Sequence, residues 1–462
     1  MQGGMAHARR GDLLTVDVTD LAFGGEGVAR ADGYVIFVPG GVPGDRLEVR
    51  LTQVRPRFGR AQIERLVTPS RHRTDPPCPY FGRCGGCRLQ HVRYEAQLEF
   101  KQRQVAESLG RLGGLGPAEE LPLRPILGAP EIYGYRNKME FTFAEADGQA
   151  IIGLHQAERY DAILDIERCL LQSETLNAIL AEVRAFVRES GSRVYCQERE
   201  DGLLRFLMLR EGQATGETMI NLVTASPDVA TAQALADRLR ARCPQVTAVV
   251  LNVNPKKAAV AVGVEEHPIA GNERIRERLG GVEFSISANS FFQTNTRQAE
   301  RLFAVVAEYA GLTGREVVFD LYSGTGAISL LLARQARAVY GIELVPAAIE
   351  DATRNAAANG IDNCVFLSGE VRHVLPELLR KGIRAEVVIA DPPRAGFHPK
   401  ALRAVLALAP TRIVYASCNP TTLARDLGTL RAGGYGITAV QPIDMFPHTP
   451  HIEAVARLER PA

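Results

Sequence analysis

Apolar and polar residues alternate in the first part of the chain, and this pattern predicts β-strands. Strand-like runs cover residues 14–19, 34–38, 47–52 and 61–67. Glycine pairs at 24–25 and 40–41 indicate turns between strands. Short strands at this spacing are typical of a small barrel. We therefore expect residues 8–70 to form a β-barrel of the oligonucleotide-binding sort.

The middle of the chain, residues 71–285, mixes strand-like and helix-like periodicities. The pattern predicts a polar helix over 95–112, further helices near 173–190 and 228–242, and a strand over 136–143 with one basic face. This mixture favours an α+β domain. The helix over 95–112 is expected to pack on the domain that follows.

From about residue 297 the pattern becomes a regular alternation of helix and strand. Strands are predicted at 316–321, 338–342, 364–367, 386–391 and 411–416, and helices at 297–310, 326–335, 346–359, 371–380, 399–408 and 420–432. This alternation indicates a parallel, doubly wound sheet. The fold class is thus α/β, with a Rossmann-like C-terminal domain over 286–462.

The overall charge does not favour any one class of partner, but its distribution does. The net charge is only +1. Basic residues are concentrated between Arg46 and Arg103, where Arg55, Arg57 and Arg60 surround Phe58. Arginines around an aromatic ring are suited to phosphate contacts and base stacking, although a solvated surface has the same composition.

Targeting signals are not evident in the sequence. Residues 1–10 lack the apolar core of a signal peptide, and no uncharged apolar run is long enough for a membrane span. The chain has eight cysteines, several of them clustered. In a reducing compartment, such a cluster is more often a metal site than a set of disulfides. We expect a cytoplasmic, monomeric protein with no membrane partner.

A glycine turn follows the first strand of the C-terminal domain. Residues 320–326 read Asp-Leu-Tyr-Ser-Gly-Thr-Gly, so Gly324 and Gly326 allow a tight turn and close approach of a ligand. Glu343 ends the next predicted strand and can accept hydrogen bonds from two ribose hydroxyls. Ser329 replaces the third glycine of a dinucleotide fingerprint. The pattern therefore favours an adenosyl ligand such as S-adenosylmethionine over a dinucleotide, with an ordinary connecting loop as the alternative.

Two more strand ends carry reactive side chains. Asp391 ends one strand in Asp-Pro-Pro-Arg, and Cys418 follows another in Ser-Cys-Asn-Pro. Ligands bind at strand exits in open α/β sheets, so the pair indicates a functional site, whereas an isolated cysteine is more often structural. Glu453, in His-Ile-Glu, reads by itself as an ordinary exposed glutamate.

A cysteine cluster lies near the start of the central domain. Cys78, Cys84 and Cys87 lie in Cys-x5-Cys-Gly-Gly-Cys, whose glycines let the backbone wrap tightly around a metal centre. A fourth ligand is needed, and Cys169 is a better candidate than His91. Spacing alone is compatible with zinc and with an iron–sulfur cluster.

These motifs together closely resemble the RNA uracil-C5 methyltransferases over nearly the whole chain. The residues that carry the resemblance are Phe291-Phe-Gln293, Asp320-Leu-Tyr322-Ser-Gly-Thr-Gly326, Glu343, Asp391-Pro-Pro-Arg394, Ser417-Cys-Asn-Pro420 and His451-Ile-Glu453. The resemblance implies that Cys418 is the nucleophile and that Glu453 is the base that takes the C5 proton. It also implies contacts to S-adenosylmethionine by Gln293, Tyr322, Glu343 and Asp391.

The N-terminal region and the cysteines extend this resemblance. Residues 11–68 look like the family's TRAM domain, an appended RNA-binding barrel. The cysteine motif is similar to the [4Fe–4S] site of the same family, with Cys169 as the distant ligand, and this favours a cluster over zinc. Members with both features more often resemble 23S ribosomal RNA enzymes, so 23S rRNA is the expected substrate.

Three alternatives stay open on the sequence alone. The substrate could be the T-loop uridine of tRNA. The protein could instead be an iron–sulfur RNA-binding protein or chaperone, although the combination of Cys418 and Glu453 argues against this. A methyltransferase for small molecules or DNA is the third reading, and the N-terminal barrel disfavours it.

Overall fold

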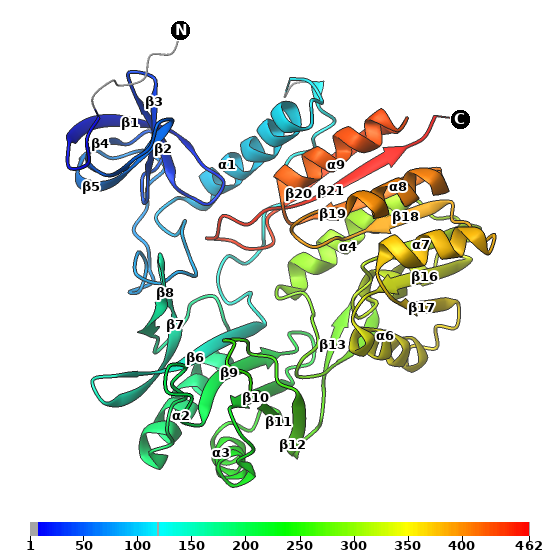
Figure 1. Cartoon of the computed structure of the whole chain (residues 1–462). Coiled ribbons are helices and arrows are strands. Elements are labelled where there is room, and N and C mark those ends of the chain that lie inside the picture. The colour runs from blue at the N-terminus through cyan, green and yellow to red at the C-terminus, as the bar shows by residue number, and fades with distance from the viewer. Residues whose placement is uncertain (1–7, 118–119, 462) are drawn as a thin grey trace.

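The computed structural model describes residues 8–117 and 120–461, arranged as a barrel, a central sheet and a C-terminal sheet (Figure 1). The first residues, considered above for a signal peptide, lie mostly outside the described range. Among the described residues, no helix has the length and apolarity needed to cross a membrane.

The N-terminal strands close into a barrel in the order β1-β2-β3-β5-β4. The strands are β1 (Leu13–Leu21), β2 (Gly27–Ala31), β3 (Tyr34–Val38), β4 (Arg46–Val54) and β5 (Phe58–Thr68). Alternate side chains such as Val16, Val18 and Ile36 are buried, as the period-2 pattern predicts. Strand β2 was not predicted, because its small residues Gly-Val-Ala-Arg-Ala give a weak strand signal.

The central sheet has the order β12-β11-β10-β9-β6-β7-β8. Its strands are β6 (Lys138–Ala146), β7 (Gln149–Gln156), β8 (Arg159–Asp165), β9 (Leu204–Glu211), β10 (Thr218–Thr224), β11 (Val246–Val253) and β12 (Glu265–Gly271). Helices α2 (Glu174–Ser190) and α3 (Val229–Arg242) pack on it through one shared core. Helix α2 begins where Ser173 accepts a hydrogen bond from the Leu176 amide and ends at left-handed Gly191.

The C-terminal sheet has the order β17-β16-β15-β18-β19-β21-β20. Its strands are β15 (Val317–Leu321), β16 (Ala338–Glu343), β17 (Cys364–Ser368), β18 (Val387–Ala390), β19 (Arg412–Ser417), β20 (Gly436–Ile443) and β21 (Glu453–Glu459). Strands β15 to β19 are parallel, as predicted. The expectation of a wholly parallel sheet is wrong at one edge, because β20 and β21 form an antiparallel hairpin and β21 pairs with β19.

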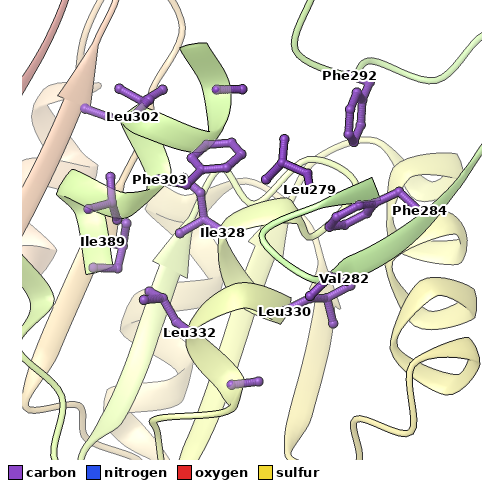
Figure 2. Close-up of a cluster of buried hydrophobic side chains, with 14 of the residues drawn as sticks. Leu279, Val282, Phe284, Phe292, Leu302, Phe303, Ile328, Leu330, Leu332 and Ile389 are labelled. Atoms are coloured by element: carbon purple, nitrogen blue, oxygen red, sulfur yellow. The ribbon is translucent and has the colours of Figure 1, made fainter. Parts of the chain in front are cut away.

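Helices cover both faces of this sheet. They are α4 (Thr296–Ala310), α5 (Ala327–Ala333), α6 (Pro346–Ala358), α7 (Val371–Arg380), α8 (Pro399–Leu408) and α9 (Pro420–Ala432). Two separate cores lie on the two faces. The hairpin of β13 (Ile275–Leu279) and β14 (Val282–Ile286) adds Leu279, Val282 and Phe284 to the core of α4 and α5 (Figure 2).

Helix α1 (Tyr94–Glu107) lies between the barrel and the C-terminal sheet (Figure 1). It continues as a π-helical turn, η1 (Ser108–Leu112), so the helix predicted over 95–112 changes geometry after Glu107. The η1 turn contacts α9, and α1 contacts the connection between β20 and β21. This helix therefore links the first part of the chain to the last.

Candidate active site

The glycine turn connects β15 to α5 at the edge where the parallel strands end. Tyr322 has φ +67° and Gly324 has φ +53°, so the backbone takes a left-handed conformation that is unusual for tyrosine. Strain of this kind is concentrated at functional sites. A Cβ atom on Gly324 would face open space, which leaves room for a ligand beside the backbone.

Glu343 lies at the end of β16, beside this turn. One carboxylate oxygen accepts from the Gly324 amide at 3.0 Å, and the other accepts from the Val345 amide at 2.9 Å. These bonds orient the carboxylate, while its remaining lone pairs stay free to accept from ribose hydroxyls. The turn and the acid therefore fit an adenosyl ligand.

Cys418 follows β19 directly and precedes α9. The neighbouring residues fix its backbone: the Ser417 hydroxyl accepts from the Asn419 amide at 3.2 Å, and the Asn419 side chain caps α9 by accepting from Thr421 at 3.0 Å. The Asn419 amide group also donates to the Arg394 carbonyl at 3.2 Å. Two strand-end loops are thereby joined beside the thiol.

The antiparallel pairing of β21 brings Glu453 to the same place. Ser417, the last residue of β19, pairs with Ala454. The next residues outward are Cys418 and Glu453, so the start of β21 lies beside the end of β19. The structure thus brings together two side chains that are far apart in the sequence.

One large cavity, of about 1010 Å³, connects these groups. The residues predicted for the site that line it are Gln293, Tyr322, Gly324, Glu343, Asp391, Cys418 and Glu453. Gly326 lies behind this lining, where it is the N-cap of α5 with φ +80°. A Cβ atom there would contact Ala352 and Phe366 at 3.0 Å, so Gly326 serves close packing of the turn.

Burial and like charges raise the pKa values of the acidic groups around the cavity. Desolvation raises the pKa of Cys418 to about 11, and the nearby Glu453 and Asp391 carboxylates add to the rise. Desolvation also raises the pKa of Asp391 to about 7 and that of Glu453 well above its usual range. Perturbed acids that converge in a cavity are typical of sites that move protons.

Arg394 is a site residue that the sequence analysis quoted in a motif without giving it a role. Its guanidinium lies 2.8 Å from His451 Nδ1, and it lowers the pKa of both Cys418 and Glu453. Desolvation, then Arg394, lowers the pKa of His451 to about 4, so the ring is neutral and can accept. Arg394 could have been predicted from the sequence, because it is a cation that directly follows the strand-end motif Asp-Pro-Pro.

The four predicted cysteine ligands line a second, smaller cavity of about 170 Å³. The segment between β5 and α1 contributes Cys78, Cys84 and Cys87 to its lining, and the segment before α2 contributes Cys169. The side chain of Asn177 fixes Cys169 by accepting from its amide at 2.9 Å and donating to its carbonyl at 3.1 Å. His91, the alternative fourth ligand, packs against Phe81 at 5.1 Å instead.

The thiols of this cavity do not form a site for a single metal ion among the described residues. Throughout residues 8–117 and 120–461, no group of three or more His, Cys, Asp or Glu side chains could hold one metal ion. Desolvation raises the pKa of Cys87 to about 12, and it raises the pKa of Cys84 and Cys169 too, with mutual repulsion adding to each. Converging thiols of this kind need a positive partner to become thiolates.

The predicted RNA-contacting side chains of the barrel are partly engaged within the protein. Arg60 forms an ion pair with Glu26 at 3.0 Å, and Phe58 packs edge-on against Phe37 at 5.6 Å between ring centroids. Arg57 is exposed. The barrel therefore presents fewer free groups than the sequence pattern predicts.

Comparison with known sequences identifies two families. The profile of the tRNA (uracil-5-)-methyltransferases matches residues 130–461, and the profile of the TRAM domain matches residues 8–63. An uncharacterized RNA methyltransferase of Halalkalibacterium halodurans is 42% identical, with 99% of each chain covered. One of Chlorobaculum tepidum is 41% identical, covering 98% of this chain and 97% of its own.

A solved structure is similar over almost the same range. The tRNA (uracil-54, C5)-methyltransferase of Pyrococcus abyssi, in complex with S-adenosyl-L-homocysteine, is 33% identical with a TM-score of 0.77. The match covers 96% of this chain and 99% of the other. The chain belongs to the tRNA (uracil-5-)-methyltransferase family: it is an S-adenosylmethionine-dependent RNA uracil-C5 methyltransferase with an N-terminal TRAM domain.

Proposed function

We propose that this enzyme forms 5-methyluridine in 23S ribosomal RNA, with Cys418 as the nucleophile and Glu453 as the base. The observation that carries the proposal is the meeting of these two side chains at one end of the large cavity whose lining also includes the glycine turn and Glu343. Methyl transfer requires that the methyl donor and the target pyrimidine lie next to each other in one cavity.

The chemistry follows from the low nucleophilicity of uracil C5. The Cys418 thiolate adds to C6, which makes C5 an enolate carbon that can attack an electrophile. C5 attacks the methyl group that S-adenosylmethionine would supply as a sulfonium; the C5–CH3 bond forms, the S–CH3 bond breaks, and S-adenosylhomocysteine leaves. Glu453 then takes the proton from C5, the C5–C6 double bond re-forms, and the S–C6 bond breaks to return the thiolate.

Other residues around the cavity would bind the methyl donor and favour ionisation of the thiol. Gln293, Tyr322, Glu343 and Asp391 would contact the adenosyl ligand, and Gly324 would allow its close approach to the backbone. Burial, with the Glu453 and Asp391 carboxylates, raises the pKa of Cys418 to about 11, and Arg394 is the neighbouring cation that partly offsets this rise and so favours the thiolate. In folded RNA, the target base must leave its stack to reach this pocket.

The choice of 23S rRNA rests on the combination of the barrel with the four-cysteine cavity. A second candidate is the T-loop uridine of tRNA, and one observation favours it: the similar Pyrococcus abyssi enzyme acts on tRNA uracil-54 and is matched along 96% of this chain. Both substrates require the same chemistry at the same cavity. Either RNA is consistent with an enzyme that works in the cytoplasm as a monomer.

We also propose that the cysteine cavity holds a [4Fe–4S] cluster. The fit is supported by four thiols that surround one space and by raised thiol pKa values that a cationic centre would reverse. Cys78, Cys84, Cys87 and Cys169 would be the ligands. The methylation chemistry needs no redox step, so the cluster would organise the loop and the segment around it.

The test uses anaerobically purified protein with labelled S-adenosylmethionine and separate pools of unmodified 23S rRNA and tRNA. We expect the label in 5-methyluridine from 23S rRNA. Label in tRNA alone would keep the mechanism and overturn the substrate. Label in neither pool, from protein that retains its iron, would contradict the proposed activity.

A further inference from the structure

The connection between β20 and β21, residues 444–452, immediately precedes Glu453. It leads directly into β21, and its Phe446 lines the same cavity as Glu453. Among residues 8–117 and 120–461, no strand pairs with the backbone of this connection. Its polar groups are instead bonded by residues from other parts of the chain. Half of these residues come from α1 or directly follow Cys87, and the others include Tyr135, Asn295 and Gln298. We call residues 444–452 the base loop.

His448 is the point where the cysteine segment reaches the base loop. Its carbonyl accepts hydrogen bonds from the amides of Arg88 and Leu89, both at 2.9 Å. These two residues directly follow Cys87. His448 has φ +64°, a left-handed conformation that a β-carbon disfavours, and its ring stacks on Tyr133 at 4.4 Å. Such a conformation persists only where the surroundings hold it.

Gln97 of α1 joins the same two segments with one buried side chain. Its oxygen accepts from the His448 amide at 3.0 Å. Its nitrogen donates to the carbonyls of Leu89 at 3.0 Å and Val92 at 2.8 Å, and lies 3.1 Å from His448 Nδ1. The amide of one glutamine thus connects the cysteine segment to the base loop.

Two further residues of α1 hold the start of the base loop. Lys101 forms a buried ion pair with Asp444 at 2.6 Å, and Tyr94 donates to the same carboxylate at 2.9 Å. A buried ion pair contributes more to a single defined geometry than to stability, because desolvation offsets much of its attraction. Helix α1 therefore fixes the position of the base loop.

We propose that α1 and the segment after Cys87 form a clamp that positions Glu453 for proton removal, with Gln97 as its central positioning residue. The clamp also couples the cysteine cavity to that step through Arg88 and Leu89. This inference rests on the proposed roles of Cys418 and Glu453. In addition, the nucleophile Cys418 and the base Glu453 are positioned by different parts of the fold.

The two halves of the reaction should therefore be separable. Cys418 is held by β19 and by the Asn419 cap of α9, which make no contact with Gln97 among the hydrogen bonds of the described residues. Loss of the clamp leaves addition and methylation possible and slows removal of the C5 proton. The methylated RNA then stays bonded to Cys418 through C6.

The experiment compares Gln97→Leu with Gln104→Leu. Both glutamines lie on α1, but Gln104 donates to Leu21 and Ala22 of the barrel and not to the base loop. Each variant is mixed with RNA and methyl-labelled S-adenosylmethionine, and the RNA bonded to protein after denaturation is measured beside kcat and KM. We expect Gln97→Leu to lower kcat at least tenfold with little change in KM and to accumulate methylated adduct. Gln104→Leu should show the wild-type adduct fraction.

A second variant covers the case in which Gln97→Leu fails to fold. His448→Gly removes the ring contacts to Gln97 and Tyr133 but keeps the backbone bonds, and glycine suits its positive φ. We expect a smaller rise in the same adduct. A variant that folds and loses kcat while its adduct fraction stays at the wild-type level overturns the clamp.

Glu453→Gln, measured in parallel, separates this inference from the proposed function. If Glu453→Gln accumulates adduct and both clamp variants do not, only the clamp is wrong. If Glu453→Gln turns over normally, the role of Glu453 is wrong and the clamp falls with it. Adduct in Glu453→Gln and Gln97→Leu, but not in Gln104→Leu, supports both.

Discussion

The two cavities of this protein are built from different kinds of structure. The large cavity lies at strand ends of one sheet, and its geometry comes from the pairing of β15, β18, β19 and β21. The small cavity is enclosed by an irregular loop and by the segment before α2, with glycines between two of its cysteines. A sheet can hold reacting groups in place without a ligand, whereas a loop of cysteines needs a bound centre to hold its shape.

This contrast predicts different results when single residues are changed. Removal of a group from the large cavity should stop one chemical step and leave the fold intact. Removal of a ligand from the small cavity should weaken the fold and affect chemistry only through the residues that follow Cys87.

Cys418→Ala should abolish methyl transfer while the protein stays folded. No other thiol of the described residues lines the large cavity, so no covalent step can replace the lost one. Transfer of labelled methyl to RNA measures the loss, and thermal unfolding checks the fold. As a control, Cys243→Ala removes a thiol buried under α3 and should keep activity. Measurable turnover by Cys418→Ala would disprove covalent catalysis by this residue.

Glu453→Gln should lower turnover by roughly 10²–10⁴-fold, the usual contribution of a general base. Addition and methylation still occur, so the variant should accumulate RNA bonded to protein. A denaturing gel with labelled RNA detects this species. Glu459→Gln, at the far end of the same strand, is the matched control and should accumulate no adduct.

Cys84→Ser should give a colourless and poorly soluble protein, because it removes one ligand of the [4Fe–4S] cluster that we propose for the small cavity. Loss of a bound metal centre removes its binding free energy from the folded state. Visible absorbance, iron content and the soluble fraction measure the effect. Cys196→Ser, at a thiol outside that cavity, should stay brown. A brown and fully folded Cys84→Ser protein would contradict the ligand assignment.

Glu343→Ala should raise the KM for S-adenosylmethionine by roughly 10- to 150-fold, since a hydrogen bond to a charged group contributes about 1.5–3 kcal/mol. The KM for RNA should change little, because Glu343 is bonded to the glycine turn, where we propose that the adenosyl ligand binds. Glu350→Ala, at an exposed position of α6, should leave both constants unchanged. Equal changes in both KM values would indicate a loss of fold rather than of a ligand contact.

Arg394→Gln should shift the alkylation of Cys418 to higher pH, because Arg394 is a cation that lowers the pKa of this thiol. The sign follows from the pKa of about 11 in the folded protein: Arg394 lowers it, so its loss makes the thiolate scarcer at a given pH. Alkylation at Cys418 is followed by peptide mass spectrometry. Arg403→Gln, at an exposed position of α8, should leave the profile unchanged.

The sequence predicted most of the C-terminal domain because its pattern is local. Strand ends at Asp391 and Cys418, and the helices after them, follow from apolar runs and from Pro and Asn at helix starts. The position of Glu453 does not follow from its own surroundings in the sequence. It depends on the antiparallel pairing of β21 with β19, and the expectation of a parallel sheet gave no reason for it.

Polar contacts between residues that are far apart in the chain could not be predicted from the sequence either. Gln97 looks like any glutamine of a polar helix, and only its packing against residues 448 and 89 gives it a role. The barrel arginines are a second case. Nothing in the sequence around Arg60 shows that Glu26, in another strand connection, pairs with it. Charge counts along a chain do not reveal which charges are neutralised by partners distant in sequence.

The most direct test of the account is a peptide map of the adduct formed by Glu453→Gln. The variant is mixed with RNA and methyl-labelled S-adenosylmethionine, digested with protease and nuclease, and analysed by mass spectrometry. We expect one peptide, containing Cys418, that carries a uridine with the labelled methyl group. An adduct on another residue, a bonded uridine without the methyl group, or free 5-methyluridine formed at the wild-type rate would contradict it.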